Sequence, residues 1–391
     1  MNTQGPIVDP GTGGNQSGLR DQNARLVLSV IRRHGALAGA EIARRSSLTA
    51  QTVSNILRAL EADGLLRREE AVKGKVGKPS IPMALNPQGV FSLGLNIGRR
   101  SAELVLVDFT GKPLTQDTIA YPYPAIETVF EFLAKSSAKI LKAHPTARPA
   151  LAGIGVGRPF EIWSWLEVVD APEASLRAWK DLDLEAKVVD VTGLDVTIFN
   201  DATTACVAEH LLGRGGAYAN FAYLFVGAFI GGGLVLDNKV VTGPTGNAGA
   251  FGAMRVPDNA GGSTQLLNVA SLHVLEHALA AADIDLDHLR DPDNDWSGYA
   301  QWVTPWIEQT ARHLALAAIT AAAVVELEAV LIDGAMPDPV RAELVNRTRA
   351  HLDDYAPTGI RKPDIEEALV GRTARSIGAA MLPIHSKYFL A

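Results

Sequence analysis

The sequence contains almost no cysteine, with Cys206 as the single thiol in 391 residues. One thiol cannot form an intrachain disulfide, which fits a reducing compartment, so we expect a cytoplasmic protein. The N-terminus also lacks an apolar run of the signal-peptide kind. The most apolar stretch, Leu314 to Ile332, is interrupted by Glu326 and Glu328. We therefore expect a buried helix followed by a strand there, and no membrane as a partner.

Charge is unevenly distributed along the chain. The formal net charge of the whole chain is -7. Residues 1–80 hold 12 Lys and Arg against 7 Asp and Glu, a net charge of +5. The remainder therefore holds 24 Lys and Arg against 36 Asp and Glu, a net charge of -12. An acidic body with a basic N-terminal segment indicates an anionic partner for that segment alone. The length is sufficient for two or three domains.

The N-terminal segment has the pattern of a winged helix-turn-helix domain. Residues 1–19 are rich in Gly, Asn, Gln and Ser without periodicity, and we expect a flexible tail. Residues 20–87 then predict helix, helix, turn, helix and a basic hairpin. In the third helix, Val53, Ile56, Leu57 and Leu60 form an apolar stripe, and Gly64 ends the helix.

The face opposite this stripe is polar, and it is followed by a lysine-rich turn. Gln side chains read adenine bidentately, short hydroxyl side chains let a helix approach DNA closely, and lysines neutralise phosphates. We therefore expect a double-stranded DNA operator as partner, the alternative being a solvated face used for dimerisation or docking. The candidate DNA-binding residues are Thr49, Gln51, Thr52, Ser54, Asn55, Arg58, Lys73, Lys75 and Lys78.

A glycine-rich stretch from Tyr223 to Gly252 dominates the rest of the chain. Its Asp237-Asn238 pair lies between two β-rich runs and predicts a hairpin. Just upstream, a short strand ends in Asn200-Asp201 and opens onto a helical run, a position where α/β folds place ligand chemistry. The plainer interpretation is that the glycines only make turns and tight packing.

Three motifs in this region resemble the ROK family of repressors, open reading frames and sugar kinases. They are Gly227 to Gly233, like the family's second phosphate loop, Gly246 to Gly249, like the start of its signature, and Asn200 to Ala202, like its catalytic Asn-Asp-Ala. The resemblance implies an α/β, two-lobed, actin-like ATPase (ribonuclease H-like) body over residues 88–391. The first lobe would span about 88–200 plus the C-terminal helix, and the second about 201–370.

The chain departs from the family pattern at the residues that carry kinase chemistry. Where the resemblance implies Asp-x-Gly-Gly-Thr-Lys for ATP, the chain has Asn96, Arg99 and Arg100, which puts ATP binding in doubt. Where it implies a sugar-binding Glu and His, the chain has Ala250 and Ala253. The zinc-binding cysteines are missing, so we expect no zinc and no other cofactor. His273 and His277 form a metal-like pattern that chance explains better.

Other positions match the family's ligand-binding segments. Asp201 would be the general base if the chain were a kinase, and a hydroxyl-binding group if it only bound a sugar; otherwise no catalytic residue is expected. The candidate effector-binding residues are Arg158, Glu173, Asn200, Asp201, Gly231, Gly232 and Asn247.

These patterns leave three functional hypotheses. The first is a regulator, a homodimer or homotetramer that represses carbohydrate genes until a sugar or sugar derivative binds its kinase-like body. The second is an active ATP-dependent sugar kinase with an added DNA-binding domain. The third is a regulator that binds no small molecule and responds only to a protein partner.

Overall fold

The computed structural model describes residues 16–71, 81–164, 171–258, 260–286, 289, 294–355 and 358–390. The chain divides into two compact units, one made of Met1–Gly89 with His385–Ala391 and the other of Val90–Ile384. The expected wing lysines Lys73, Lys75 and Lys78 lie outside the described residues.

The smaller unit has a winged helix-turn-helix fold. Its strands pair antiparallel, with Leu66 opposite Leu85, and Leu37 adds an isolated bridge to Met83. The first helix begins earlier than expected, within the segment that we expected to be a tail. The elements are α1 (Gln16–His34), α2 (Gly39–Ser46), α3 (Ala50–Ala62), β1 (Leu66–Arg68) and β2 (Met83–Leu85).

Helix α3 is fixed by its cap and by one buried face. The side chain of Thr49 accepts a hydrogen bond from the Thr52 backbone N–H, so the expected N-cap is present. Ser47 in the preceding turn has a left-handed backbone, with φ of 57°. Val53 and Leu60 of the predicted stripe are buried in the core of the unit. The same spacing leaves the other face of α3 in solvent.

The C-terminal segment His385–Ala391 belongs to this unit and packs on α1. The Phe389 side chain is fully buried, and Arg32 lies 5.3 Å from the centre of its ring. Arg25 Nε donates to the Phe389 carbonyl at 2.9 Å, and the Leu390 N–H donates to Ser29 Oγ at 2.9 Å. Helix α12 (Ala374–Tyr388) therefore starts in the larger unit and ends in the smaller one.

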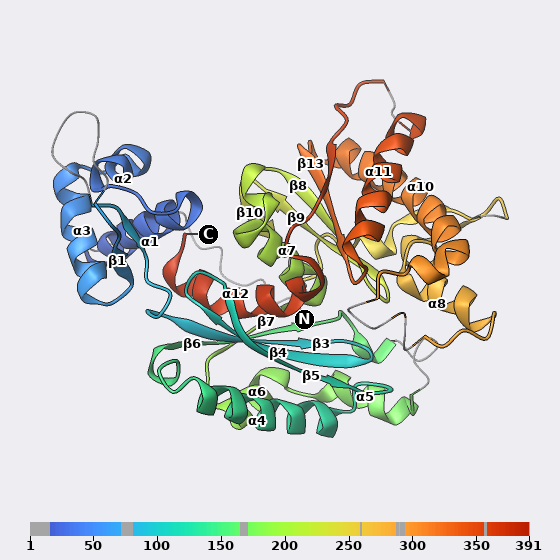
Figure 1. Ribbon diagram of the computed structural model, residues 1–391, viewed down its shortest axis with the longest axis horizontal. Coiled ribbons are helices and arrows are strands. Elements are labelled where there is room, and N and C mark those ends of the chain that lie inside the picture. Colours follow the sequence, from blue (N-terminus) through green and yellow to red (C-terminus); the bar gives the residue numbers. More distant parts are fainter. Residues whose placement is uncertain are drawn as a thin grey trace, which may run out of the picture. The chain divides into compact units, whose positions relative to one another are not determined.

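The larger unit contains two five-stranded sheets of the same topology (Figure 1). In each sheet three antiparallel strands are followed by two strands parallel to the first of them. This repeat confirms the two-lobed fold. The first sheet contains β3 (Phe91–Ile97), β4 (Ser101–Asp108), β5 (Pro113–Ala120), β6 (Leu151–Arg158) and β7 (Val196–Asn200). The second contains β8 (Phe221–Val226), β9 (Ile230–Leu236), β10 (Lys239–Val241), β13 (Ala329–Gly334) and β14 (Asp364–Glu367).

Helices cover both sheets, and the Asp237-Asn238 pair makes the predicted hairpin between β9 and β10. Helices α4 and α6 lie on one face of the first sheet, and α12 lies on the other (Figure 1). The remaining elements are α4 (Ile126–Ala143), α5 (Glu173–Asp181), α6 (Leu184–Thr192), α7 (Asp201–Leu212), β11 (Arg255–Pro257), β12 (Ser263–Gln265), α8 (Leu272–Ala280), α10 (Ala300–Val324) and α11 (Asp338–Tyr355).

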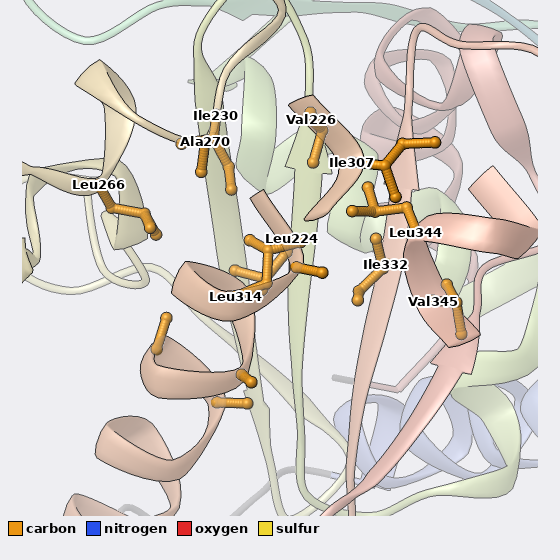
Figure 2. Close-up of a cluster of buried hydrophobic side chains, with 14 of the residues drawn as sticks. Leu224, Val226, Ile230, Leu266, Ala270, Ile307, Leu314, Ile332, Leu344 and Val345 are labelled. Atoms are coloured by element: carbon orange, nitrogen blue, oxygen red, sulfur yellow. The ribbon is translucent and has the colours of Figure 1, made fainter. Parts of the chain in front are cut away.

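The core of the second lobe lies between its sheet and the helices α10 and α11. Figure 2 shows Leu224 and Ile332 of the sheet near Leu314 of α10 and Leu344 of α11, all of them buried. The predicted helix followed by a strand is therefore α10 followed by β13. No helix in the described part of the chain combines the length and the hydropathy of a membrane span.

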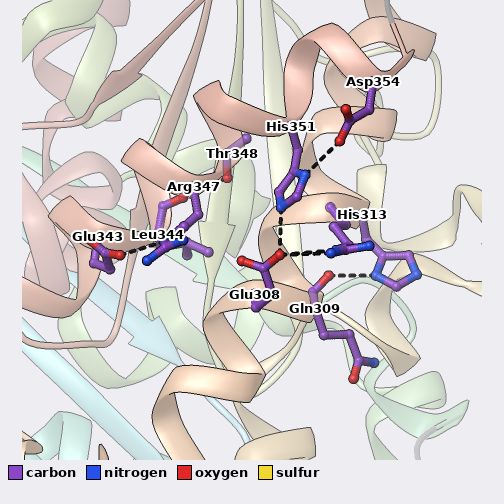
Figure 3. Close-up of polar contacts among 10 residues, drawn as sticks. Glu308, Gln309, His313, Glu343, Leu344, Arg347, Thr348, His351 and Asp354 are labelled. Carbon is purple, nitrogen blue, oxygen red and sulfur yellow. Dashed lines mark hydrogen bonds and ion pairs between the residues drawn. The ribbon is translucent and has the colours of Figure 1, made fainter.

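On their outer side α10 and α11 are joined by polar contacts (Figure 3). Glu308 accepts from His351 Nε2 at 2.8 Å and pairs with Arg312 at 3.0 Å. His351 Nδ1 lies 2.8 Å from the Asp354 carboxylate. The partly exposed network holds the two helices in one register.

Helix α12 packs at backbone distance on both of its neighbours. A Cβ added to Gly155 of β6 would overlap the Ala379 backbone, and one added to Gly378 would overlap the Thr204 carbonyl oxygen of α7. Only glycine permits such close approach. Helix α12 therefore joins the first sheet to α7, whose first residue is Asp201.

Candidate functional site

The exposed face of α3 carries a connected set of polar side chains. Asn55 Oδ1 accepts from Gln51 Nε2 at 3.2 Å and from an Arg58 guanidinium nitrogen at 2.7 Å. Arg58 Nε also donates to the Ser54 carbonyl at 3.3 Å. These contacts hold three long side chains along one edge of an exposed helix, with their remaining polar atoms facing solvent.

A pocket of about 210 Å³ lies in the larger unit, at the start of α7. Its walls come from both sheets, because Gly98 and Arg99 follow β3 while Phe225 and Ile230 belong to β8 and β9. Arg375 of α12 contributes a further wall. The volume lies below the roughly 300–1,000 Å³ of sites for drug-sized ligands.

The polar floor of this pocket is formed by Asn200, Asp201 and Asn247. Asn200 caps α7, because its side-chain oxygen accepts the Ala202 backbone N–H at 2.9 Å. Its Nδ2 donates to Asn247 Oδ1 at 3.4 Å. One Asp201 oxygen accepts the same Ala202 N–H, and the other lies 3.6 Å from an Arg375 nitrogen. Amide and carboxylate groups in this arrangement suit the hydroxyl groups of a polyol.

Two arginines lie beside Asp201. The Arg99 guanidinium lies 3.1 Å from the centre of the Phe229 ring, and Arg375 lies 4.9 Å from the centre of the Phe225 ring. Burial lowers the pKa of Arg99 to about 9, with the nearby charges of Asp201 and Arg375 acting in opposite directions. That pKa is above neutral pH, so Arg99 remains a cation.

Two glycines of the expected phosphate loop, Gly231 and Gly232, line the pocket, but their surroundings explain them by packing. A Cβ on Gly231 would overlap the Ala202 side chain of α7, and one on Gly232 would overlap Phe251. Strand β9 and helix α7 thus lie too close for larger residues. The packing interpretation that the sequence left open accounts for these glycines without a phosphate.

Residues at positions where the resemblance implies polar groups also line the pocket. Ala250, Ala253 and Leu267 have only apolar side-chain atoms. Asn96 is fully buried, and within the described residues neither atom of its carboxamide has a hydrogen-bond partner. The pocket therefore contains fewer hydroxyl-binding groups than the resemblance implies.

The other expected effector-binding residues lie outside the lining of this pocket. Glu173 is at the start of α5 and pairs with Arg177 one turn later. Arg158 lies 5.8 Å from the centre of the Trp163 ring, and burial lowers its pKa. The structure thus brings together Asn200, Asp201, Gly231, Gly232 and Asn247, and not these two.

The two histidines of α8 line a neighbouring pocket of about 590 Å³. The His273 ring is tilted by 43° against the Phe229 ring, with 4.5 Å between their centres, and the centre of the His277 ring lies 6.1 Å from that of His273. Burial lowers the pKa of His273, which leaves it neutral at pH 7. Within the described residues no three His, Cys, Asp or Glu side chains come together as a metal site.

Sequence reasoning missed Arg375, and it treated Arg99 as a poor substitute for a glycine against a phosphate, although its charge could attract one. Arg375 is in the last helix, where the small residues drew attention to packing. An arginine among small residues at the start of a buried helix was the available signal, since an arginine there needs a partner.

Comparisons with known proteins agree with this architecture. Residues 92–386 match the ROK family, and residues 17–75 match the MarR family. A xylose repressor of Caldicellulosiruptor bescii is 27% identical over 245 residues, which make up 61% of this chain and 60% of that protein. The chain therefore spans less than two thirds of the length of that relative.

Two solved structures share the fold. A ROK family transcriptional regulator, a homologue of the E. coli MLC protein, is 21% identical with a TM-score of 0.68, covering 95% of this chain and 97% of that one. A ROK hexokinase from Thermus thermophilus is 23% identical with a TM-score of 0.53, covering 75% of this chain and 97% of the hexokinase. The first likeness includes the smaller unit, whereas the second leaves a quarter of this chain unmatched.

Proposed function

Since the chain belongs to the ROK family, we propose that it is a DNA-binding transcriptional regulator, a repressor of carbohydrate-metabolism genes. Its sugar-kinase-like body would sense an effector. The observation that carries the proposal is the exposed polar face of α3 in a winged helix-turn-helix unit. The xylose-repressor name of a relative supports the assignment to carbohydrate genes.

Helix α3 is the proposed recognition helix. Its buried stripe fixes the helix to the unit, and its polar face is accessible to a major groove. Gln51 and Thr52 lie in its first turn, the part of a recognition helix that contacts base edges. Asn55 orients Gln51 and Arg58 before any contact is made, which lowers the entropy lost on binding. Lys73, Lys75 and Lys78 remain expected phosphate contacts.

The pocket argues against the alternative of an active sugar kinase. Catalysis would require ATP, and Arg99 stands in the loop where the resemblance implies a glycine against a phosphate. Ala250 and Ala253 stand where it implies groups that hold the sugar. Asp201 is present, but one carboxylate does not distinguish a general base from a ligand contact. We therefore propose a body that binds its ligand without phosphorylating it.

The regulator would act as a homodimer or homotetramer, because a symmetric protein fits two operator half-sites. The chain passes between its two units twice, at Gly89–Val90 and at Ile384–His385. Two covalent connections restrict the motion of the smaller unit more than a single connection would. A movement of the lobes of the larger unit could therefore be transmitted to the smaller unit through either connection. Operator binding also requires the cytoplasmic location expected from the single cysteine.

Binding of the purified protein to its own upstream intergenic DNA, followed by fluorescence anisotropy over salt concentration, tests the proposal. We expect tight, salt-steep binding. Arg58→Ala should weaken it by about 1–3 kcal/mol if Arg58 contacts a base. Arg347→Ala is the matched control, since Arg347 is an exposed arginine of the larger unit. Absence of sequence-selective binding would refute the proposal and redirect the work to an ATP-consumption assay with sugars, with Asp201→Ala as its control.

A further inference from the structure

The polar network on the exposed face of α3 has an orientation that its chemistry fixes. A guanidinium only donates hydrogen bonds, so the Asn55 atom that lies 2.7 Å from Arg58 Nη2 has to be the side-chain oxygen. The same oxygen lies 3.2 Å from the Gln51 side chain, so the Gln51 atom in this contact has to be the nitrogen Nε2. The donors and acceptors that each side chain keeps for a ligand can therefore be assigned.

Asn55 uses its whole acceptor capacity inside the network. A carboxamide oxygen has two lone pairs, and the donors of Gln51 and Arg58 take both of them. Asn55 keeps only N–H donors, so it cannot make the bidentate contact with adenine, which needs an acceptor for the N6 amino group. Asn55 is thus a positioning residue that acts through its two neighbours.

Gln51 keeps one donor and one acceptor. One of its Nε2 N–H groups donates to Asn55, which leaves the second N–H group and the oxygen Oε1. In the major groove adenine presents the N7 acceptor and the N6 donor, whereas guanine presents the two acceptors N7 and O6. The free atoms of Gln51 therefore match adenine.

Arg58 keeps one edge of its guanidinium group. Its Nε donates to the Ser54 carbonyl at 3.3 Å and its Nη2 donates to Asn55, and these two donors belong to the same side edge. The end edge, formed by Nη1 and Nη2, keeps a pair of parallel N–H donors. Such a pair matches N7 and O6 of guanine, and it does not match adenine, whose N6 group is a donor.

The positions of Gln51 and Arg58 on α3 also predict the spacing of the two bases. The residues stand at i and i+7, hence on the same face of the helix. At a rise of about 1.5 Å per residue they are about 10 Å apart along the helix axis. A recognition helix lies in the major groove, and this distance covers about three base-pair steps of about 3.4 Å.

We propose that α3 reads an operator half-site in which Gln51 binds an adenine and Arg58 binds a guanine about three base pairs away, with Asn55 positioning both side chains. This inference rests on the proposed function, because it names the bases that the proposed recognition helix reads. The competing use of Arg58 is a contact with a phosphate. A phosphate contact carries no base preference, so the two uses of Arg58 are distinguishable.

The test uses the full-length protein. It first selects its binding site from a pool of random DNA duplexes, and fluorescence anisotropy then measures its affinity for that site and for every single-base-pair substitution of one half-site. The base preference at a position is the ratio of the affinities before and after its substitution. We expect preferences of about 5- to 150-fold at an A·T pair and at a G·C pair about three base pairs apart.

Variants then assign each preference to a side chain. Gln51→Ala should remove the preference at the A·T pair only, and Arg58→Ala should remove that at the G·C pair only. Asn55→Ala should lower both preferences by about 2- to 10-fold, the value of one hydrogen bond. Asn55→Asp keeps an acceptor oxygen, so it should retain both preferences while its charge weakens binding to every duplex.

The matched control is Arg347→Ala, which removes an exposed arginine of the larger unit and should change neither preference. Gln51, Asn55 and Arg58 are exposed, so their variants should fold, and circular dichroism checks this. The series of substituted duplexes with the wild-type protein requires no variant at all.

Three results would overturn the inference. The first is that Gln51→Ala or Arg58→Ala removes a preference at a pair other than A·T or G·C, respectively, or at pairs that are not about three base pairs apart. The second is equal weakening of every duplex by Arg58→Ala with a smaller salt slope, which indicates a phosphate contact. The third is that Asn55→Ala leaves both preferences unchanged.

Each of these results leaves the proposed function standing, because the wild-type protein still selects a DNA sequence. If the wild-type protein selects no sequence and binds all duplexes alike, the proposed function is refuted, and the base assignment falls with it. The outcome for the wild-type protein thus separates the two failures.

Discussion

The docking of the C-terminal segment predicts that Phe389→Ala destabilises the DNA-binding unit selectively. Phe389 is fully buried against α1, and its backbone carbonyl accepts from Arg25. Truncating a buried phenylalanine to alanine costs about 3–5 kcal/mol. That is a large share of the about 5–15 kcal/mol that stabilises a typical domain. The substitution should therefore unfold the smaller unit well before the larger one.

The distribution of tryptophan allows the two units to be followed separately. All six tryptophans lie between residues 163 and 306, hence in the larger unit. Tryptophan fluorescence thus reports the unfolding of that unit, and far-ultraviolet circular dichroism reports helices in both. In urea, Phe389→Ala should produce an early dichroism transition and leave the fluorescence midpoint almost unchanged. Operator affinity should fall at the same low urea concentration.

The matched control is Leu19→Ala, which shortens a side chain of α1 that is 51% exposed. Its effect should stay within about 0.5 kcal/mol. Coincident and unshifted dichroism and fluorescence transitions in Phe389→Ala would refute the reasoning. They would mean that the segment does not contribute to the stability of the smaller unit.

Two further predictions concern the larger unit. Gly378→Ala should lower the free energy of unfolding by about 1–3 kcal/mol, because its Cβ would overlap a carbonyl oxygen of α7. Gly298→Ala is the control, since it has open space around it and should be near neutral in the same fluorescence-monitored urea unfolding. Equal effects of the two substitutions would contradict the packing argument. Glu308 has its pKa lowered by hydrogen bonds from Arg312 and then His351. The ionised Glu308 carboxylate therefore contributes to folding stability at pH values above its unfolded-state pKa of about 4.3. This contribution is lost as the pH falls through the lower pKa that Glu308 has in the folded state. The difference in unfolding free energy between wild type and Glu308→Gln is at most about 1 kcal/mol for so exposed a pair, and it should shrink as the pH falls from about 6 to about 3. A constant difference across that range would contradict the stabilising role of the Glu308 ion pairs.

The parts of the fold that depend on local pattern were predictable. The stripe of Val53 and Leu60 indicates α3 because helical periodicity is visible within one segment. The strands from Phe91 to Asp108 follow from their apolar runs in the same way. The docking of Phe389 on α1 was not predictable, because it joins residues more than 350 positions apart and leaves no periodicity in either segment.

The candidate site was predictable only in part, for a related reason. Asn200 and Asp201 stand at a strand end, where the topology of an α/β fold places ligand chemistry. Arg375 reaches the same pocket from α12, and no local rule connects a residue of the last helix with a strand end in the first lobe. Glu173 was chosen because it resembles a family position, but the neighbour that the structure gives it is Arg177 on its own helix.

The glycines of β9 show why a family signature and a family activity are separable. Gly231 and Gly233 face the side chains of Ala202 and Cys206 on α7, and a Cβ at either position would overlap them. Any chain that packs these two elements so closely needs glycine there, whether or not it binds a phosphate. The glycine pattern is therefore evidence for the fold. Evidence for the chemistry has to come from the side chains that line the pocket.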